Sequence, residues 1–84
     1  RNPAIARFVQ QSDEHARALL RAILVKGRKQ HGLSCDEATL EGRIDLICAL
    51  FQGLHLRPLC NPQRDEAQAV HALRLAMSPL LFGE

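Results

Sequence analysis

The chain has 84 residues, enough for one domain but not for a large core, because a chain of this length buries only about 60–65% of its unfolded surface. Hydrophobic residues make up 46% of it and aromatic residues only 4%, a balance rich in Leu, Ala and Arg that argues against β-sheet and predicts an all-helical protein. A net charge of +2 does not by itself indicate nucleic-acid binding. Three widely spaced cysteines predict a cytoplasmic protein without a disulfide framework. No apolar run approaches the ~20 residues of a membrane span.

The first predicted helix spans about residues 3–31. Asn2 and Pro3 suit a helix start, and Gly32 is placed to end it. At 1.5 Å per residue its ~29 residues reach about 43 Å, beyond the roughly 30 Å diameter of a compact chain of this length, so we expect missing chain or a second subunit to cover part of it. Its apolar stripe contains Ile5, Phe8, Val9, Ser12, Ala16, Leu19, Leu20, Ile23 and Gly27, and its expected solvated face contains Arg7, Gln10, Glu14, Arg17, Arg21 and Arg28.

The second predicted helix, about 35–57, has two apolar flanks. Ser34 and Glu37 form a capping-box pattern at its start, and Pro58 is expected to end it. We expect the two flanks to meet different neighbours. The bulky flank carries Ile44, Ile47, Cys48, Phe51, Leu54 and His55. The smooth flank carries Gly42, Ala49 and Gly53, which indicate close approach by another helix unless these glycines are merely tolerated.

The third predicted helix spans about 62–78. Asn61 and Pro62 repeat the cap-plus-proline opening of the first helix, and Ser78-Pro79 is expected to bend or end it. With short connections and no internal repeat, the sequence predicts three helices in an up-down-up arrangement. The last helix presents an apolar stripe with one arginine inside it, formed by Val70, Leu73, Arg74, Met77, Leu80 and Leu81.

The spacing of reactive side chains does not favour catalysis, metal binding or a cofactor. The four histidines and three cysteines form no C-x-x-C or H-E-x-x-H pattern, so we expect no metal site. Cys48 is expected to be a structural thiol, because no activating cation lies near it in the sequence. No glycine-rich phosphate loop is present, and we therefore expect a protein that is not an enzyme. The basic residues of the first helix suit a solvated face better than nucleic acid, because no aromatic residues interleave them.

A few polar residues lie on otherwise apolar faces. Such isolated polar groups are what a small-molecule pocket uses to orient a ligand, although each residue also suits a core position bonded to a backbone carbonyl or to water. The candidate ligand-binding residues are Phe8, Ser12, His15, Cys48, Phe51 and His55.

The whole chain resembles the C-terminal half of tetracycline-repressor-type (TetR family) transcriptional regulators. The resemblance rests on the helix layout, on ALFQGLHLRPL at 49–59 and on SPLLFG at 78–83. It implies a C-terminal domain over residues 1–84 that binds a small hydrophobic effector. It also implies a homodimer in which the last two helices of each copy form a four-helix bundle. DNA would be bound, in the expected repressor, only through a separate N-terminal helix-turn-helix domain that this chain does not contain.

We assign the smooth flank and the last helix's stripe to the predicted dimer, and the bulky flank to core and pocket; the reverse assignment also fits the sequence. The competing hypothesis is a helical dimerisation or adaptor module without a ligand. The sequence does not identify the effector or the operator. The predicted dimer residues are Leu46, Ala49, Gly53, Leu56, Val70, Leu73, Arg74, Met77 and Leu80.

Overall fold

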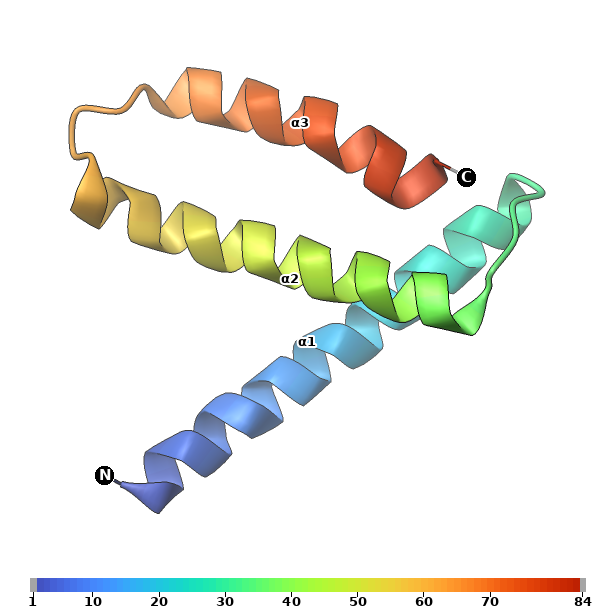
Figure 1. The fold of residues 1–84 in the computed structure, drawn as a ribbon, viewed down its shortest axis with the longest axis horizontal. Coiled ribbons are helices and arrows are strands. Elements are labelled where there is room, and N and C mark those ends of the chain that lie inside the picture. Colours follow the sequence, from blue (N-terminus) through green and yellow to red (C-terminus); the bar gives the residue numbers. More distant parts are fainter. Residues whose placement is uncertain (1, 84) are drawn as a thin grey trace.

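The computed structural model describes residues 2–83 and is all-α, as predicted from composition. Its helices are α1 (Pro3–Gln30), α2 (Glu37–Cys60) and α3 (Glu66–Phe82). Figure 1 shows α2 and α3 as an antiparallel pair and α1 crossing α2 at a steep angle. Within this part of the chain, none of the helices combines the length and the hydropathy that crossing a membrane requires.

The helix starts follow the capping side chains, and two of them differ from the prediction. Asn2 caps α1 as expected, accepting from the Ala4 amide at 2.9 Å. The predicted Ser34 and Glu37 capping box is wrong, because Asp36 caps α2 and accepts from Thr39 N at 3.2 Å. The predicted start of the third helix at 62 is also wrong. Asp65 caps α3, and the preceding residues form a turn. In both cases a carboxylate close to the first turn is the acceptor, which the positive end of the helix favours.

The predicted ends of the second and third helices, at 57 and 78, are too early. Pro58 lies inside α2 and Pro79 inside α3, and each helix continues for a further two or three residues. Proline has a helix-compatible φ, so near a helix end it removes one backbone hydrogen bond without preventing the last turn. The last turns close through Asn61 N donating to Arg57 O at 2.7 Å and Gly83 N donating to Pro79 O at 2.8 Å.

The core is small and lies where α1 crosses the other two helices. Leu24 of α1 and three residues of α2, Leu40, Ile44 and Ile47, are its buried members. It is completed by partly buried side chains from all three helices, namely Leu20, Val25, Cys48, Met77, Leu80 and Leu81.

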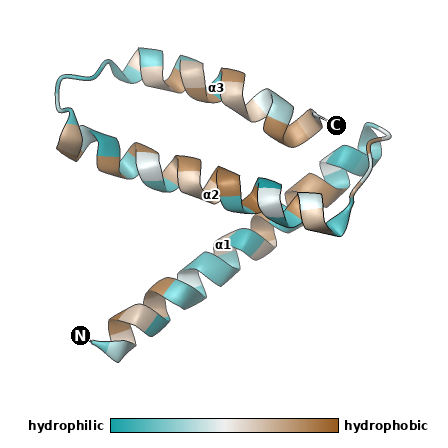
Figure 2. Ribbon diagram, viewed as in Figure 1, coloured by the Kyte–Doolittle hydropathy of each residue, from teal (hydrophilic) through white to brown (hydrophobic). Residues whose placement is uncertain are grey.

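The molecule is flat, and it is two helices deep where α1 crosses α2. Its radius of gyration is 15.1 Å and its extents are 41 × 36 × 16 Å, whereas a compact chain of this length has a radius of gyration near 12 Å. α2 and α3 lie side by side, and α1 passes across one face of α2 (Figure 1). Figure 2 shows hydrophobic residues on the N-terminal half of α1, which projects beyond α2 and α3.

α1 packs against α2 through the edge of its apolar stripe rather than the centre. Leu20 and Leu24 contact the core, whereas the centre of the stripe is exposed. Arg28, predicted on the solvated face, is buried with 3% of its surface exposed, so that prediction is wrong. The exposed residues of the α1 stripe are Ile5, Phe8, Val9, Leu19 and Ile23.

Candidate functional site

A cleft of about 350 Å³ lies between α1 and α2, and we call it the α1–α2 cleft. It brings together four of the six predicted ligand-binding residues, two from each helix. These are Phe8, Ser12, Cys48 and Phe51. Its other lining residues are Val9, Asp13, Ala16, Leu20 and Gln52.

The two predicted histidines do not line this cleft. His15 is exposed on α1. His55 is exposed on α2, and its Nδ1 lies 2.8 Å from the carbonyl oxygen of Phe51 one turn earlier. Both rings therefore lie outside the α1–α2 cleft, although they share helices with residues that form it.

The polar groups of the α1–α2 cleft can orient a ligand but are not set up for nucleophilic chemistry. Burial raises the pKa of the Cys48 thiol, and the nearby carboxylates of Asp13 and Asp45 raise it further. A thiol with a raised pKa is largely protonated at neutral pH and is a poor nucleophile. The hydroxyl of Ser12, the amide of Gln52 and this thiol are therefore suited to hydrogen bonding inside an otherwise apolar cleft.

Part of the cleft's lining was not predicted from the sequence. Three of these lining residues lie close to predicted ones in the sequence. Asp13 and Ala16 follow Ser12 by one and four positions, and Gln52 follows Phe51 by one. Helical spacing places residues three and four apart on one face, so extending the predicted faces by one turn from Ser12 and Cys48 finds Ala16 and Gln52. Asp13 lies beside the α1 face, and its place in the cleft does not follow from that spacing.

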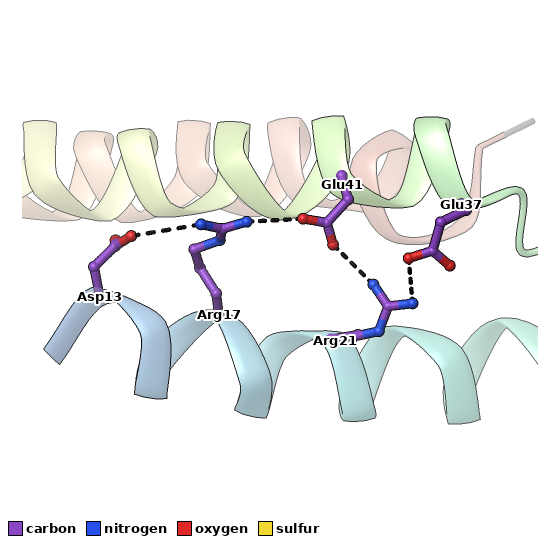
Figure 3. Close-up of polar contacts among 5 residues, drawn as sticks. All are labelled: Asp13, Arg17, Arg21, Glu37 and Glu41. Atoms are coloured by element: carbon purple, nitrogen blue, oxygen red, sulfur yellow. Dashed lines mark hydrogen bonds and ion pairs between the residues drawn. The ribbon is translucent and has the colours of Figure 1, made fainter. Parts of the chain in front are cut away.

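A row of charged side chains, the ion ladder, joins α1 to α2 near that crossing (Figure 3). Arg17 of α1 lies 3.9 Å from Asp13 and 2.8 Å from Glu41 of α2. Arg21 pairs with Glu41 at 2.8 Å and also with Glu37. The hydrogen bond to Glu41 raises the pKa of Arg17, and the hydrogen bond to Glu37 raises that of Arg21. Because these side chains are well exposed, the ladder sets geometry and adds little stability.

A second cleft of about 510 Å³, the α2–α3 groove, separates the far halves of α2 and α3. Small and aliphatic side chains line most of it, and two arginines stand near the loop that joins the helices. It includes three predicted dimer residues, Ala49, Gly53 and Leu73. The remaining lining residues are Leu50, Leu54, Arg57, Arg64, Ala69, Ala72 and Ala76.

The close approach expected at the glycines of α2 is not made within this chain. A Cβ added to Gly42 or Gly53 meets no atom within 4 Å. The smooth flank is therefore uncovered at both positions, and α3 does not fill it.

The other predicted dimer residues divide into two groups. Met77 and Leu80 pack against the core of their own chain, so they are partly covered without a partner. Leu46, Leu56 and Val70 are among the exposed large hydrophobic residues, and Arg74 is also exposed. α2 and α3 thus have an exposed surface that a second subunit could cover. It contains fewer residues than the predicted dimer interface, because Met77 and Leu80 are partly covered by their own chain.

Two arginines that the sequence analysis did not single out hold the end of α3, and we call them the arginine clamp. Arg28 donates to Ser34 O at 2.8 Å, Leu81 O at 3.0 Å and Gly83 O at 2.9 Å. Arg43 donates to the carbonyls of Pro79, Leu80 and Gly83 at 3.0, 2.7 and 2.7 Å. The clamp joins α1 and α2 to the last carbonyls of α3.

Comparison with family models, curated proteins and solved structures finds no match to this chain. Among residues 2–83, no three His, Cys, Asp or Glu side chains are grouped so that they could hold a metal ion. The two clefts, the ion ladder and the uncovered apolar faces are therefore the features from which a function is inferred.

Proposed function

We propose that the chain is the effector-sensing and dimerising domain of a transcriptional regulator of the tetracycline-repressor type, whose DNA-binding head is a separate domain. The observation that carries this proposal is the α1–α2 cleft, which is largely apolar and lies between two helices. Its two aromatic walls, Phe8 and Phe51, are 69% and 43% exposed. Apolar surface of this kind around a few hydrogen-bonding groups suits a small hydrophobic ligand.

The position of the cleft suits a switch. It lies at the crossing of α1 and α2, so a ligand in it contacts both helices. The ion ladder, the small core and the arginine clamp hold the helices at that crossing. A ligand that prefers one crossing angle shifts the population towards it, and a differential affinity worth about 1–3 kcal/mol changes operator occupancy several-fold or more.

The uncovered residues of α2 and α3 support a homodimer. Leu46, Leu56 and Val70 are exposed large hydrophobic side chains on the two helices that form the antiparallel pair. A second copy placed against this pair makes four helices and covers apolar side chains that this chain leaves exposed, as helical bundles do.

The second candidate function is a helical dimerisation module that binds no ligand. The long exposed stripe of α1 favours it, because protein partners alone suffice to cover that stripe. The two functions differ in whether the α1–α2 cleft takes up a small molecule in the assembled protein.

The first test is to determine the coding sequence preceding Arg1 and the solution mass of the full-length protein. A helix-turn-helix segment upstream and a mass of two chains are expected. An upstream sequence without such a segment, or a monomer at micromolar concentration, contradicts the regulator proposal.

The second test probes the α1–α2 cleft of the full-length protein with indole, a neutral aromatic compound, by NMR. Saturable shifts at Ser12 and Phe51 are expected, and Cys48→Phe should abolish them by filling the cleft. Cys60→Phe is the matched control, because Cys60 is exposed at the end of α2 and should leave the shifts unchanged. Dimerisation without any saturable shift favours the ligand-free module.

A further inference from the structure

The α2–α3 groove has an apolar length and a charged end. Its walls are alanine, glycine and leucine along both helices, from Ala49 to Leu54 on α2 and from Ala69 to Ala76 on α3. Arg57 and Arg64 are the only charged residues that line it, and both lie next to the loop between the helices. The volume of about 510 Å³ falls within the range of roughly 300–1,000 Å³ typical of ligand pockets.

The arginine end of the groove has unused hydrogen-bond donors. The Arg64 side chain is 16% exposed, its Nη2 pairs with Glu66, and its Nε is buried without a partner. Arg57 makes no ion pair within the described residues. The other carboxylate at this end, Asp65, accepts the capping hydrogen bond from Gln68 N. Arg64 Nε has no accessible surface, so the donors open to a ligand at this end are those of the unpaired Arg57 guanidinium, and a carboxylate from outside the chain would supply its counter-charge.

We propose that the α2–α3 groove binds an amphipathic monocarboxylate, with its alkyl chain between the small residues and its carboxylate on Arg57. A guanidinium offers planar, paired donors that match a carboxylate. The alkyl chain covers the walls that α3 leaves open. This site is separate from the α1–α2 cleft, and it exists whether or not the chain belongs to a DNA-binding regulator.

The charged end distinguishes this occupant from a helix of a second copy. A helix would also pack on alanine and glycine, but an apolar helical stripe brings no counter-charge to Arg57. A neutral apolar ligand leaves the same guanidinium unpaired. An anion with an apolar tail satisfies both parts of the groove.

Isothermal titration calorimetry of the full-length protein with decanoate, below its micelle concentration, tests the proposal. Decanol and decyltrimethylammonium are the matched neutral and cationic probes. Saturable binding of one decanoate per chain is expected, at least tenfold tighter than either matched probe. Equal affinities for the three probes, or no saturable heat with decanoate, overturn it.

Two glycine variants locate the site. Gly53→Leu places a side chain in the groove, and Gly42→Leu places the same side chain on the same helix outside it. Neither added Cβ meets an atom within 4 Å, and replacing a helical glycine favours the helix, so both variants should fold, as far-UV circular dichroism will show. We expect G53L to weaken decanoate binding at least tenfold and G42L to leave it unchanged. Equal affinity of the two variants overturns the placement.

A charge variant tests the role assigned to Arg57. Arg57→Gln should weaken decanoate binding about three- to tenfold and leave decanol binding unchanged; an equal loss for both ligands contradicts the carboxylate assignment. The indole shifts in the α1–α2 cleft should be the same in G53L as in the unsubstituted protein. Failure of decanoate to bind therefore leaves the proposed function standing, and failure of indole to bind leaves this proposal standing.

Discussion

Arg28 has the largest difference between its place in the sequence pattern and its place in the fold. Its charged side chain lies on the polar side of the α1 periodicity, yet it is buried and donates three hydrogen bonds to carbonyls. The last four carbonyls of a helix lack intrahelical partners and carry the negative end of the helix dipole. Arg28 and Arg43 supply both the donors and the positive charge to α3. The arginine clamp therefore holds α3 in place of a larger core.

Replacing Arg28 with Met should lower the free energy of unfolding by about 2 kcal/mol, because the carbonyls of Ser34 and Leu81 lose their side-chain donor and that of Gly83 keeps only Arg43. Urea denaturation followed by circular dichroism measures the change. Arg7→Met is the matched control, since Arg7 is exposed on α1 and a surface substitution usually changes stability by no more than about 0.5 kcal/mol. Equal stability of the two variants would show that the clamp does not hold α3.

Charge pattern in the sequence could not reveal this role. A basic residue in the last turn of a helix suits its own helix's dipole, and Arg28 satisfies that simple expectation at the end of α1. Two of its three acceptors, the carbonyls of Leu81 and Gly83, are more than fifty residues away in the sequence. The packing of the three helices determines that the Arg28 guanidinium contacts the C-terminal end of α3.

At the scale of a helix, the start of α2 has two residues that the sequence pattern allows as caps, Ser34 and Asp36, and only Asp36 acts as one. Asp36 accepts from Thr39 N at 3.2 Å and from Thr39 Oγ1 at 3.0 Å. Ser34 instead presents its backbone carbonyl to Arg28. The side chain of Ser34 therefore has no capping role, although the residue belongs to the same connection.

Asp36→Ala should destabilise the protein by about 1 kcal/mol, because an N-cap side chain satisfies an amide that the helix leaves free. Ser34→Ala keeps the carbonyl that Arg28 uses and should change stability by no more than about 0.5 kcal/mol. Thermal unfolding of both variants at one protein concentration gives the comparison. A larger loss in S34A than in D36A would restore the capping box at Ser34 and Glu37.

Existence and order of the helices followed from periodicity, but their ends and faces did not. Pro58 and Pro79 end a helix in an isolated pattern. In the folded chain, helical turns continue past both of them, and past Pro79 the clamp occupies the free carbonyls. The apolar stripe of α1 predicted a core face centred on Ser12, whereas α1 meets α2 through Leu20 and Leu24 at the stripe's edge. Salt bridges from Arg17 and Arg21 draw the charged side of α1 against α2, and a hydrophobicity pattern does not contain that preference.

At the scale of the molecule, the α1–α2 cleft was partly predictable because it forms where two predicted faces meet. Phe8 and Ser12 lie on the α1 stripe and Cys48 and Phe51 on the bulky flank, so any crossing of those faces brings the four together. The α2–α3 groove was not predicted, because it depends on α3 diverging from α2 between the clamp and the loop. Small residues indicate where helices approach closely, but they also leave space when the helices diverge.

The thin shape of the molecule predicts that its stability depends on protein concentration. The thin fold leaves Leu46 and Leu56 on α2 and Ile23 on α1 exposed, and a chain of this size has little core with which to offset its conformational entropy. A homodimer that buries one of these faces is stabilised by mass action, so its Tm should rise as concentration increases.

Leu46→Glu should remove that concentration dependence and give a single-chain mass by sedimentation equilibrium, because it places a charge in the face that we assign to the second subunit. Ile23→Glu, on the exposed stripe of α1, should leave the dimer intact, and Gln63→Glu in the exposed connection between α2 and α3 controls for the added charge. If I23E dissociates the dimer and L46E does not, the partner covers α1 and the assignment of the faces is reversed. A Tm independent of concentration in the unsubstituted protein, together with a single-chain mass, would mean that the helices remain folded without any partner.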